Sequence, residues 1–142
     1  TGGMSLHLAQ HARSVIGVEA VSEAVVDARR NAERNEIGNC RFVSTLAEDL
    51  LADATAKERR YDLVVVDPPR AGLHKKVIQG ILDLGPDRFL YVSCNAESLA
   101  QDLAEFVSGG YEIQVAQPVD LFPHTPHCEV ITSLIRTPSW QR

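Results

Sequence analysis

Apolar residues recur along the chain with two periods that alternate. Compact runs rich in β-branched residues, such as "SVIGVE" at 14–19, are typical of strands. Between such runs lie longer segments whose apolar residues are spaced by three and four, as at positions 21, 25, 28 and 32. Ser22 is a suitable N-cap for this segment, so we predict a helix there. The continuous apolar run in "YDLVVVD" at 61–67 is typical of a strand buried on both faces of a parallel sheet.

The same patterns divide the whole chain into alternating elements. They predict helices at 4–11, 22–35, near 47–57, near 74–84 and at 96–108. They predict strands at 14–19, 40–44, 61–67, 88–94, 111–120 and 128–136. This alternation is typical of βαβ units with right-handed crossovers and a parallel sheet. Because no internal repeat or interdomain linker is visible, we predict a single α/β domain over residues 1–142.

Composition narrows the class of protein further. The chain has 142 residues, of which 44% are hydrophobic and 23% charged, as expected for a soluble globular domain with a real core. No apolar run approaches the roughly 20 residues needed to cross a bilayer, so we predict no membrane partner. The net charge of −5 argues against nucleic-acid binding unless a local basic patch or another domain supplies the positive charge.

The cysteines and histidines give little support to a disulfide or a metal site. Three cysteines stand far apart without a CxxC pair, and this spacing favours free thiols in a reducing cytoplasm. The segment "VDLFPHTPHCEV" at 119–130 gathers an aspartate, two histidines and a cysteine around two prolines. Its spacing matches no standard zinc pattern, so we predict a rigid loop and no metal.

Several predicted strands end on a residue that is capable of chemistry. Open α/β sheets bind ligands beyond the carboxyl ends of their strands, which makes Glu19, Asp67 and Cys94 candidate site residues. Glu19 could accept hydrogen bonds from ribose hydroxyls, or it could be a solvated acid at the start of a helix. After Asp67, two prolines stiffen the chain, and Arg70 could pair with a phosphate or form a surface ion pair.

Cys94 and Glu129 form a possible pair of nucleophile and base. A lone cysteine is commonly buried filler, but Cys94 precedes a predicted helix, whose N-terminus stabilises the reactive thiolate. Glu129 opens the last predicted strand and is a candidate general base, provided that it faces Cys94. The alternative for Glu129 is an exposed acid at a strand edge.

Taken together, these motifs resemble the RNA uracil-C5 methyltransferases that use S-adenosyl-L-methionine. The matching pieces occur in the family's order over nearly the whole chain and are "GG" before a helix, "VIGVE", "DPPRAGL", "YVSCN" and "VDLFPHTPHCE". The resemblance implies a Rossmann-like class I methyltransferase fold, with a mostly parallel sheet, helices on both faces and a late antiparallel strand. It also implies that the sheet's first strand is missing and that an upstream RNA-binding part is absent, so we expect the chain alone to be marginally stable and to bind cofactor weakly.

The resemblance also implies roles for individual residues. Cys94 would be the nucleophile that adds to C6 of uracil, and Glu129 the base that removes the C5 proton. Four residues would bind the cofactor, namely Gly2, Gly3, Glu19 and Asp67. Three further residues, Arg70, Asn95 and His124, would bind the RNA substrate.

The RNA and the reaction have alternatives. We predict 23S ribosomal RNA as the substrate, with a uridine of transfer RNA as the alternative. An amino-group methyltransferase also carries "DPP" after a buried strand but needs no nucleophilic cysteine. A cofactor- or RNA-binding module without catalysis is the remaining alternative.

Overall fold

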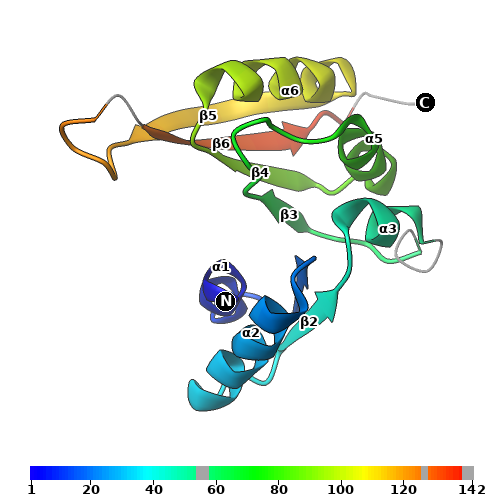
Figure 1. Cartoon of the computed structure of the whole chain (residues 1–142). Coiled ribbons are helices and arrows are strands. Elements are labelled where there is room, and N and C mark those ends of the chain that lie inside the picture. The colour runs from blue at the N-terminus through cyan, green and yellow to red at the C-terminus, as the bar shows by residue number, and fades with distance from the viewer. Residues whose placement is uncertain (54–57, 126–127, 139–142) are drawn as a thin grey trace. The chain divides into compact units, whose positions relative to one another are not determined.

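The computed structural model describes residues 1–53, 58–125 and 128–138 and divides the chain into two compact units. The first unit spans Thr1–Leu50 and the second Leu51–Arg142 (Figure 1). Each unit has its own sheet and its own apolar core. The single domain expected over 1–142 stays a prediction.

The first unit contains a pair of parallel strands with two helices packed on them. Its elements are α1 (Gly3–Ala9), β1 (Val15–Glu19), α2 (Ser22–Arg34) and β2 (Cys40–Ser44), and α3 (Ala47–Ala52) follows at the boundary. Phe42 of β2 is buried against Leu6 of α1 and against the α2 stripe predicted from its spacing, namely Val25, Ala28 and Ala32. Both helices therefore pack against Phe42.

The second unit contains a mixed sheet of four strands in the order β3-β4-β6-β5. Its elements are β3 (Leu63–Val66), α5 (Lys75–Leu84), β4 (Arg88–Ser93), α6 (Ala96–Ser108), β5 (Tyr111–Val119) and β6 (Glu129–Arg136). β3 and β4 are parallel, whereas β6 runs antiparallel to both of its neighbours, β4 and β5. β6 is thus the late antiparallel strand that the family resemblance implies.

The core of this unit lies between one face of the sheet and the helices α5 and α6. Phe89 and Tyr91 occupy alternate positions of β4, so they lie on the same face of the sheet, and both are fully buried. Helix α6 lies along the sheet (Figure 1). Phe106 of α6 packs on Phe89 with ring centroids 4.4 Å apart. Burial of one such ring contributes roughly 1.5–3 kcal/mol, so this aromatic cluster fixes how α6 sits on β4.

Two predicted strands end earlier than their apolar runs suggest. The run at 61–67 forms a strand only over Leu63–Val66, because Pro68 and Pro69 have no N–H to continue the ladder. The expected burial on both faces is wrong for β3, which is an edge strand of its sheet with Leu63 41% exposed. The run at 88–94 ends at Ser93, which leaves Cys94 outside the strand. By contrast, the helix expected at 96–108 has those bounds. Residues 54–57 of the expected helix at 47–57 lie outside the described residues.

A buried carboxylate connects α6 to the sheet and to the loop after β3. Asp102 of α6 is only 8% exposed, and its Oδ2 accepts hydrogen bonds from the Tyr91 hydroxyl at 2.6 Å and the Leu73 amide at 2.8 Å. Burial, together with the hydrogen bond to Asp102, raises the pKa of Tyr91 far above its ordinary value of 10.0. Tyr91 therefore remains a hydrogen-bond donor throughout the physiological pH range.

The substitution Tyr91→Phe tests this connection through its dependence on pH. The variant leaves the buried Asp102 carboxylate with one donor fewer, which should lower the free energy of unfolding by roughly 1–3 kcal/mol at pH 7. Because folding holds the Tyr91 proton more tightly than the unfolded chain does, the parent protein loses stability as the pH rises above 10.0. Urea unfolding of the full-length protein at pH 7 to 11 should show the difference shrinking above pH 10, and a constant difference would contradict this account.

Thr132 offers a second stability test, of opposite sign. Its side chain on β6 is fully buried, and its hydroxyl has no hydrogen-bond partner within the described part of the chain. Thr132→Val should therefore stabilise the fold by about 1 kcal/mol, because it removes an unpaired hydroxyl at nearly constant volume. The same change at Thr137, whose hydroxyl donates to the Gly110 carbonyl at 2.7 Å, should cost about 1 kcal/mol. Thermal unfolding compares the two variants, and destabilisation by both would show that Thr132 has a partner.

Candidate functional site

Cys94 lies in a tight turn between the end of β4 and the start of α6. The Ser93 hydroxyl donates to the Asn95 carbonyl at 2.9 Å and accepts from the Asn95 amide at 3.1 Å, which holds the chain around Cys94. Asn95 caps the helix, because its Oδ1 accepts from the Glu97 amide at 3.1 Å. The half-buried Cys94 thus stands directly before the capping residue of a 13-residue helix.

The register of the sheet brings Glu129 to the same place. β4 and β6 are antiparallel, and Ser93 is paired with Val130. Cys94 directly follows Ser93 and Glu129 directly precedes Val130, so the two residues flank the last pair of the ladder. Both residues are half-buried. Although they are far apart in the sequence, the predicted nucleophile and the predicted base both lie at this end of the β4–β6 pair.

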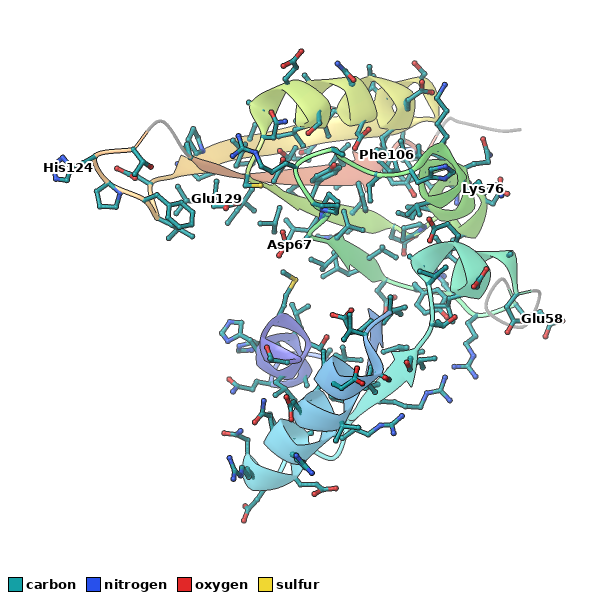
Figure 2. The ribbon with its side chains drawn as sticks, in the orientation of Figure 1. Glu58, Asp67, Lys76, Phe106, His124 and Glu129 are labelled. Carbon is teal, nitrogen blue, oxygen red and sulfur yellow. The ribbon has the colours of Figure 1, made fainter. Side chains whose placement is uncertain are left out.

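Asp67 lies at this same end of the sheet. It directly follows β3, which is parallel to β4, so the carboxyl ends of the two strands are adjacent. Figure 2 shows Asp67 and Glu129 at this end of the four-stranded sheet. Asp67 is exposed and begins the loop of residues 67–73, here called the proline loop, which continues to α5. Asp67 and Cys94, placed at strand ends by the sequence, each directly follow a strand, and Glu129 opens β6 as expected.

The proline loop is attached to the first turn of α6 by hydrogen bonds to a single carbonyl group. The Arg70 carbonyl accepts from Asn95 Nδ2 at 2.9 Å and from the Ser98 hydroxyl at 3.0 Å. The Arg70 side chain itself belongs to an exposed residue. Substrate binding by Asn95 stays a prediction. In the structure, its side-chain nitrogen donates to the Arg70 carbonyl and its side-chain oxygen accepts from the Glu97 amide.

Sequence reasoning missed the two other polar residues of α6 that hold this loop, Ser98 and Asp102. Their spacing from Asn95, by three and then four positions, places all of them on one face of the helix. Asp102 also lies next to the apolar stripe formed by Leu99 and Leu103. A polar residue beside apolar residues at helical spacing was the signal that could have identified Asp102 as a buried, hydrogen-bonded group.

The predicted cofactor residues Gly2, Gly3 and Glu19 all lie in the first unit. Glu19 ends β1, and its Oε1 accepts from the Val21 amide at 3.0 Å, just before α2 begins. This hydrogen bond corresponds to the second interpretation of Glu19, an acid at the start of a helix. The other carboxylate oxygen, Oε2, takes no part in the bond. A Cβ at Gly3 would meet no atom within 4 Å, so the backbone faces open space there.

Gly2 has a structural requirement of its own. Its φ of +80° lies in the left-handed region that favours glycine. A Cβ at this position would lie 2.8 Å from Ala28 Cβ and 2.9 Å from Phe42 Cζ. Packing against α2 and β2 is therefore sufficient to require glycine at position 2, and its predicted contact with the cofactor stays a prediction.

His124 lies in the loop between β5 and β6, away from the strand ends. Its φ is +68°, and Figure 2 shows it at the outer end of that loop, on the far side from Glu129. Within the loop, the Thr125 hydroxyl donates a hydrogen bond to the Phe122 carbonyl at 2.7 Å. Leu121 and Phe122 remain 61% and 47% exposed, although the sequence analysis gave them no role.

The three cysteines have different surroundings, and none forms a disulfide. Cys40 packs against the core of the first unit, and burial raises the pKa of its thiol, as expected of a structural cysteine. Cys128 is exposed, with its Sγ 3.3 Å from the Glu129 carbonyl oxygen. Within residues 1–53, 58–125 and 128–138, no three side chains of the metal-binding types come together, and His127 lies outside this part.

No helix in the described part of the chain combines the length and the apolar character needed to cross a membrane.

Comparison with known proteins gives a consistent family. The model of the tRNA (uracil-5-)-methyltransferase family matches residues 1–137. An "uncharacterized RNA methyltransferase" of Enterococcus faecalis is 45% identical over 135 residues, or 95% of this chain. A protein of the same description from Halalkalibacterium halodurans is 47% identical over 133 residues, or 94% of this chain. The chain spans only 30% and 29% of the lengths of these relatives.

Solved structures show the same fold. The Pyrococcus abyssi tRNA (uracil-54, C5)-methyltransferase, in complex with S-adenosyl-L-homocysteine, superposes with a TM-score of 0.81 at 33% identity. The match covers 94% of this chain and 32% of that one. The YcgJ protein of Bacillus subtilis, only 14% identical, has a TM-score of 0.75 over 96% of this chain and 88% of its own, which shows the fold alone.

The fold is the Rossmann-like class I methyltransferase fold. Because the family model spans nearly the whole sequence, the chain belongs to the tRNA (uracil-5-)-methyltransferase family.

Proposed function

We propose that this chain is the catalytic part of an enzyme that transfers a methyl group from S-adenosyl-L-methionine to C5 of a uridine in RNA. The observation that carries the proposal is the register between β4 and β6, which brings Cys94 and Glu129 to the same end of the sheet. Asp67 directly follows the adjacent parallel strand β3 at the same edge. A thiol nucleophile and a carboxylate base are the groups that this reaction requires.

The reaction needs a nucleophile because C5 of uracil is too weak to attack a methyl group directly. The Cys94 thiolate forms a bond to C6, and the displaced electron pair moves through C5 and C4 onto the carbonyl oxygen as an enolate. C5 would then form the new carbon–carbon bond to the methyl group, whose bond to the sulfonium sulfur would break with S-adenosyl-L-homocysteine as the leaving group. Glu129 then takes the proton from C5, and the electrons of that C–H bond reform the double bond and expel the thiolate.

Different residues of the chain would bind different parts of the cofactor. S-adenosyl-L-methionine supplies an electrophilic methyl group when it is bound. Glu19 retains Oε2 for a ribose hydroxyl, and the backbone at Gly3 faces open space that the methionine part would use. Asp67, at the end of β3, would lie beside both cofactor and uracil.

The RNA is proposed to reach Cys94 as a uridine flipped out of its stack. The exposed Arg70 follows Asp67 in the proline loop and would pair with an RNA phosphate, and His124 would contact the RNA from the β5–β6 loop. Ribosomal 23S RNA stays our predicted substrate. Transfer RNA is favoured by the names of the family and of the Pyrococcus abyssi enzyme, so both RNAs should be assayed.

We place the enzyme in the cytoplasm. All three cysteines are free, which suits a reducing compartment, and RNA modification takes place where the RNA is. Processing of ribosomal RNA would be its setting if the 23S substrate is correct.

Trapping with 5-fluorouridine tests the role of Cys94. Full-length protein, incubated with S-adenosyl-L-methionine and RNA containing 5-fluorouridine, should form a covalent adduct, because fluorine cannot leave C5 as a proton does. Cys94→Ala should abolish both the adduct and methyl transfer. Cys128→Ala, which removes the exposed thiol next to Glu129, is the control and should keep both. Activity that survives Cys94→Ala would favour an amino-group methyltransferase, and a parent protein that forms no adduct would favour a binding module.

Glu129→Gln tests the base. Without a carboxylate to accept the C5 proton, turnover should fall by about 10²–10⁴-fold. Formation of the covalent bond should persist, so that an adduct accumulates even on ordinary uridine RNA. Gel analysis of the RNA–protein adduct, together with methyl incorporation, measures the two steps separately. Loss of the adduct in this variant would show that Glu129 acts before proton removal.

A further inference from the structure

One face of α6 carries three polar side chains, and all of them bond to the proline loop. We call Asn95, Ser98 and Asp102 the α6 polar stripe. Asn95 and Ser98 donate to the Arg70 carbonyl, and Asp102 accepts from the Leu73 amide at 2.8 Å. The loop is thus fastened at two points on either side of Gly72. A segment held at two points moves with the helix that holds it.

Gly72 shows how closely the loop lies on the stripe. Its φ is +82°, and its amide donates to the Pro69 carbonyl at 2.9 Å, which closes a turn around Arg70. A Cβ at position 72 would lie 2.7 Å from Asp102 Oδ2 and 3.2 Å from Ser98 Cβ. Only glycine satisfies both the backbone angle and this close approach. The loop therefore has a defined position along α6.

The same stripe is connected to the catalytic cysteine. Asn95, the first residue of the stripe, directly follows Cys94 and is held by Ser93. At the other end of the stripe, the Tyr91 hydroxyl donates to Asp102 at 2.6 Å, which ties α6 to β4 three residues before Cys94. Thiol, helix and loop consequently form one hydrogen-bonded unit, and the exposed Arg70 lies on the part of the loop that this unit holds.

We propose that the α6 polar stripe positions Arg70 relative to the Cys94 thiol, so that its guanidinium binds an RNA phosphate next to the target uridine. This inference rests on the proposed function and names how the same site holds its RNA. Asn95, Ser98 and Asp102 act as positioning residues through the loop backbone. The binding energy of a phosphate contact is useful for catalysis only if it fixes the uridine over the thiol.

A double-mutant cycle between Ser98 and Arg70 tests this positioning. Binding of oligouridylate to the full-length protein is measured over a range of salt concentrations for the parent, Ser98→Ala, Arg70→Gln and the double variant. Arg70→Gln should remove one phosphate contact and reduce the slope of log affinity against log salt by roughly 0.7. Ser98→Ala should weaken binding by about threefold to tenfold and also reduce the slope, because the guanidinium loses its fixed position. In the Arg70→Gln background, Ser98→Ala should add less than about a twofold effect.

A matched serine on the same helix provides the control. The Ser108 hydroxyl donates to the Ala104 carbonyl at 2.8 Å in the last turn of α6, away from the proline loop. Ser108→Ala should leave both the affinity for oligouridylate and the salt slope unchanged. If Ser98→Ala weakens binding equally in both backgrounds, or leaves the slope unchanged, the stripe only stabilises the helix and the proposal is wrong.

Failure of this inference is distinguishable from failure of the proposed function. The cycle measures phosphate binding and needs no methyl transfer, whereas the proposed function fails if the parent protein forms no 5-fluorouridine adduct. A parent that forms the adduct but shows additive effects in the cycle would retain the reaction and lose the positioning role.

Discussion

The second unit depends on one buried carboxylate with donors from two directions. Asp102 accepts from the Tyr91 hydroxyl of β4 and from the Leu73 amide of the proline loop. A carboxylate removed from water is stable only when its oxygens are paired, so the helix, the strand and the loop must adopt their positions together. This constraint couples the fold to the site, because the loop continues from Asp67 and the strand ends next to Cys94. Packing of Phe106 on Phe89 reinforces the same arrangement from the apolar side.

The position of β6 explains how a nucleophile and a base from distant parts of the sequence meet. β6 is inserted antiparallel between β4 and β5, so the start of β6 lies beside the end of β4. In a purely parallel sheet, the start of a strand would lie at the opposite edge from the ligand site. The single reversed strand therefore allows Glu129, a strand-opening residue, to join residues that follow strands. The direction of one strand decides the chemistry available at this edge.

Elements with strong local signals could be predicted closely from the sequence. The α6 helix at 96–108 and the strand at 40–44 have the predicted bounds, because helical spacing and a β-branched run are properties of neighbouring residues. The strand predicted at 88–94 ends one residue earlier, because the Ser93 hydroxyl bonds to the Asn95 backbone and turns the chain. The candidate residues at strand ends could be chosen because connectivity alone predicts where ligands bind in an α/β sheet.

The sequence by itself determined the alternation of helices and strands, the placement of Asp67 and Cys94 at the carboxyl ends of strands, and the family to which the motifs point. These depend on local periodicity and on the order of motifs along the chain. Only the tertiary structure decided that Glu129 lies at the same end of the sheet as Cys94, that Asn95 and Ser98 hold the Arg70 carbonyl, and that Asp102 is a buried acceptor. The reason is physical: strand pairing and hydrogen bonding between segments depend on which surfaces meet in space, and spacing within one segment carries no information about its partner.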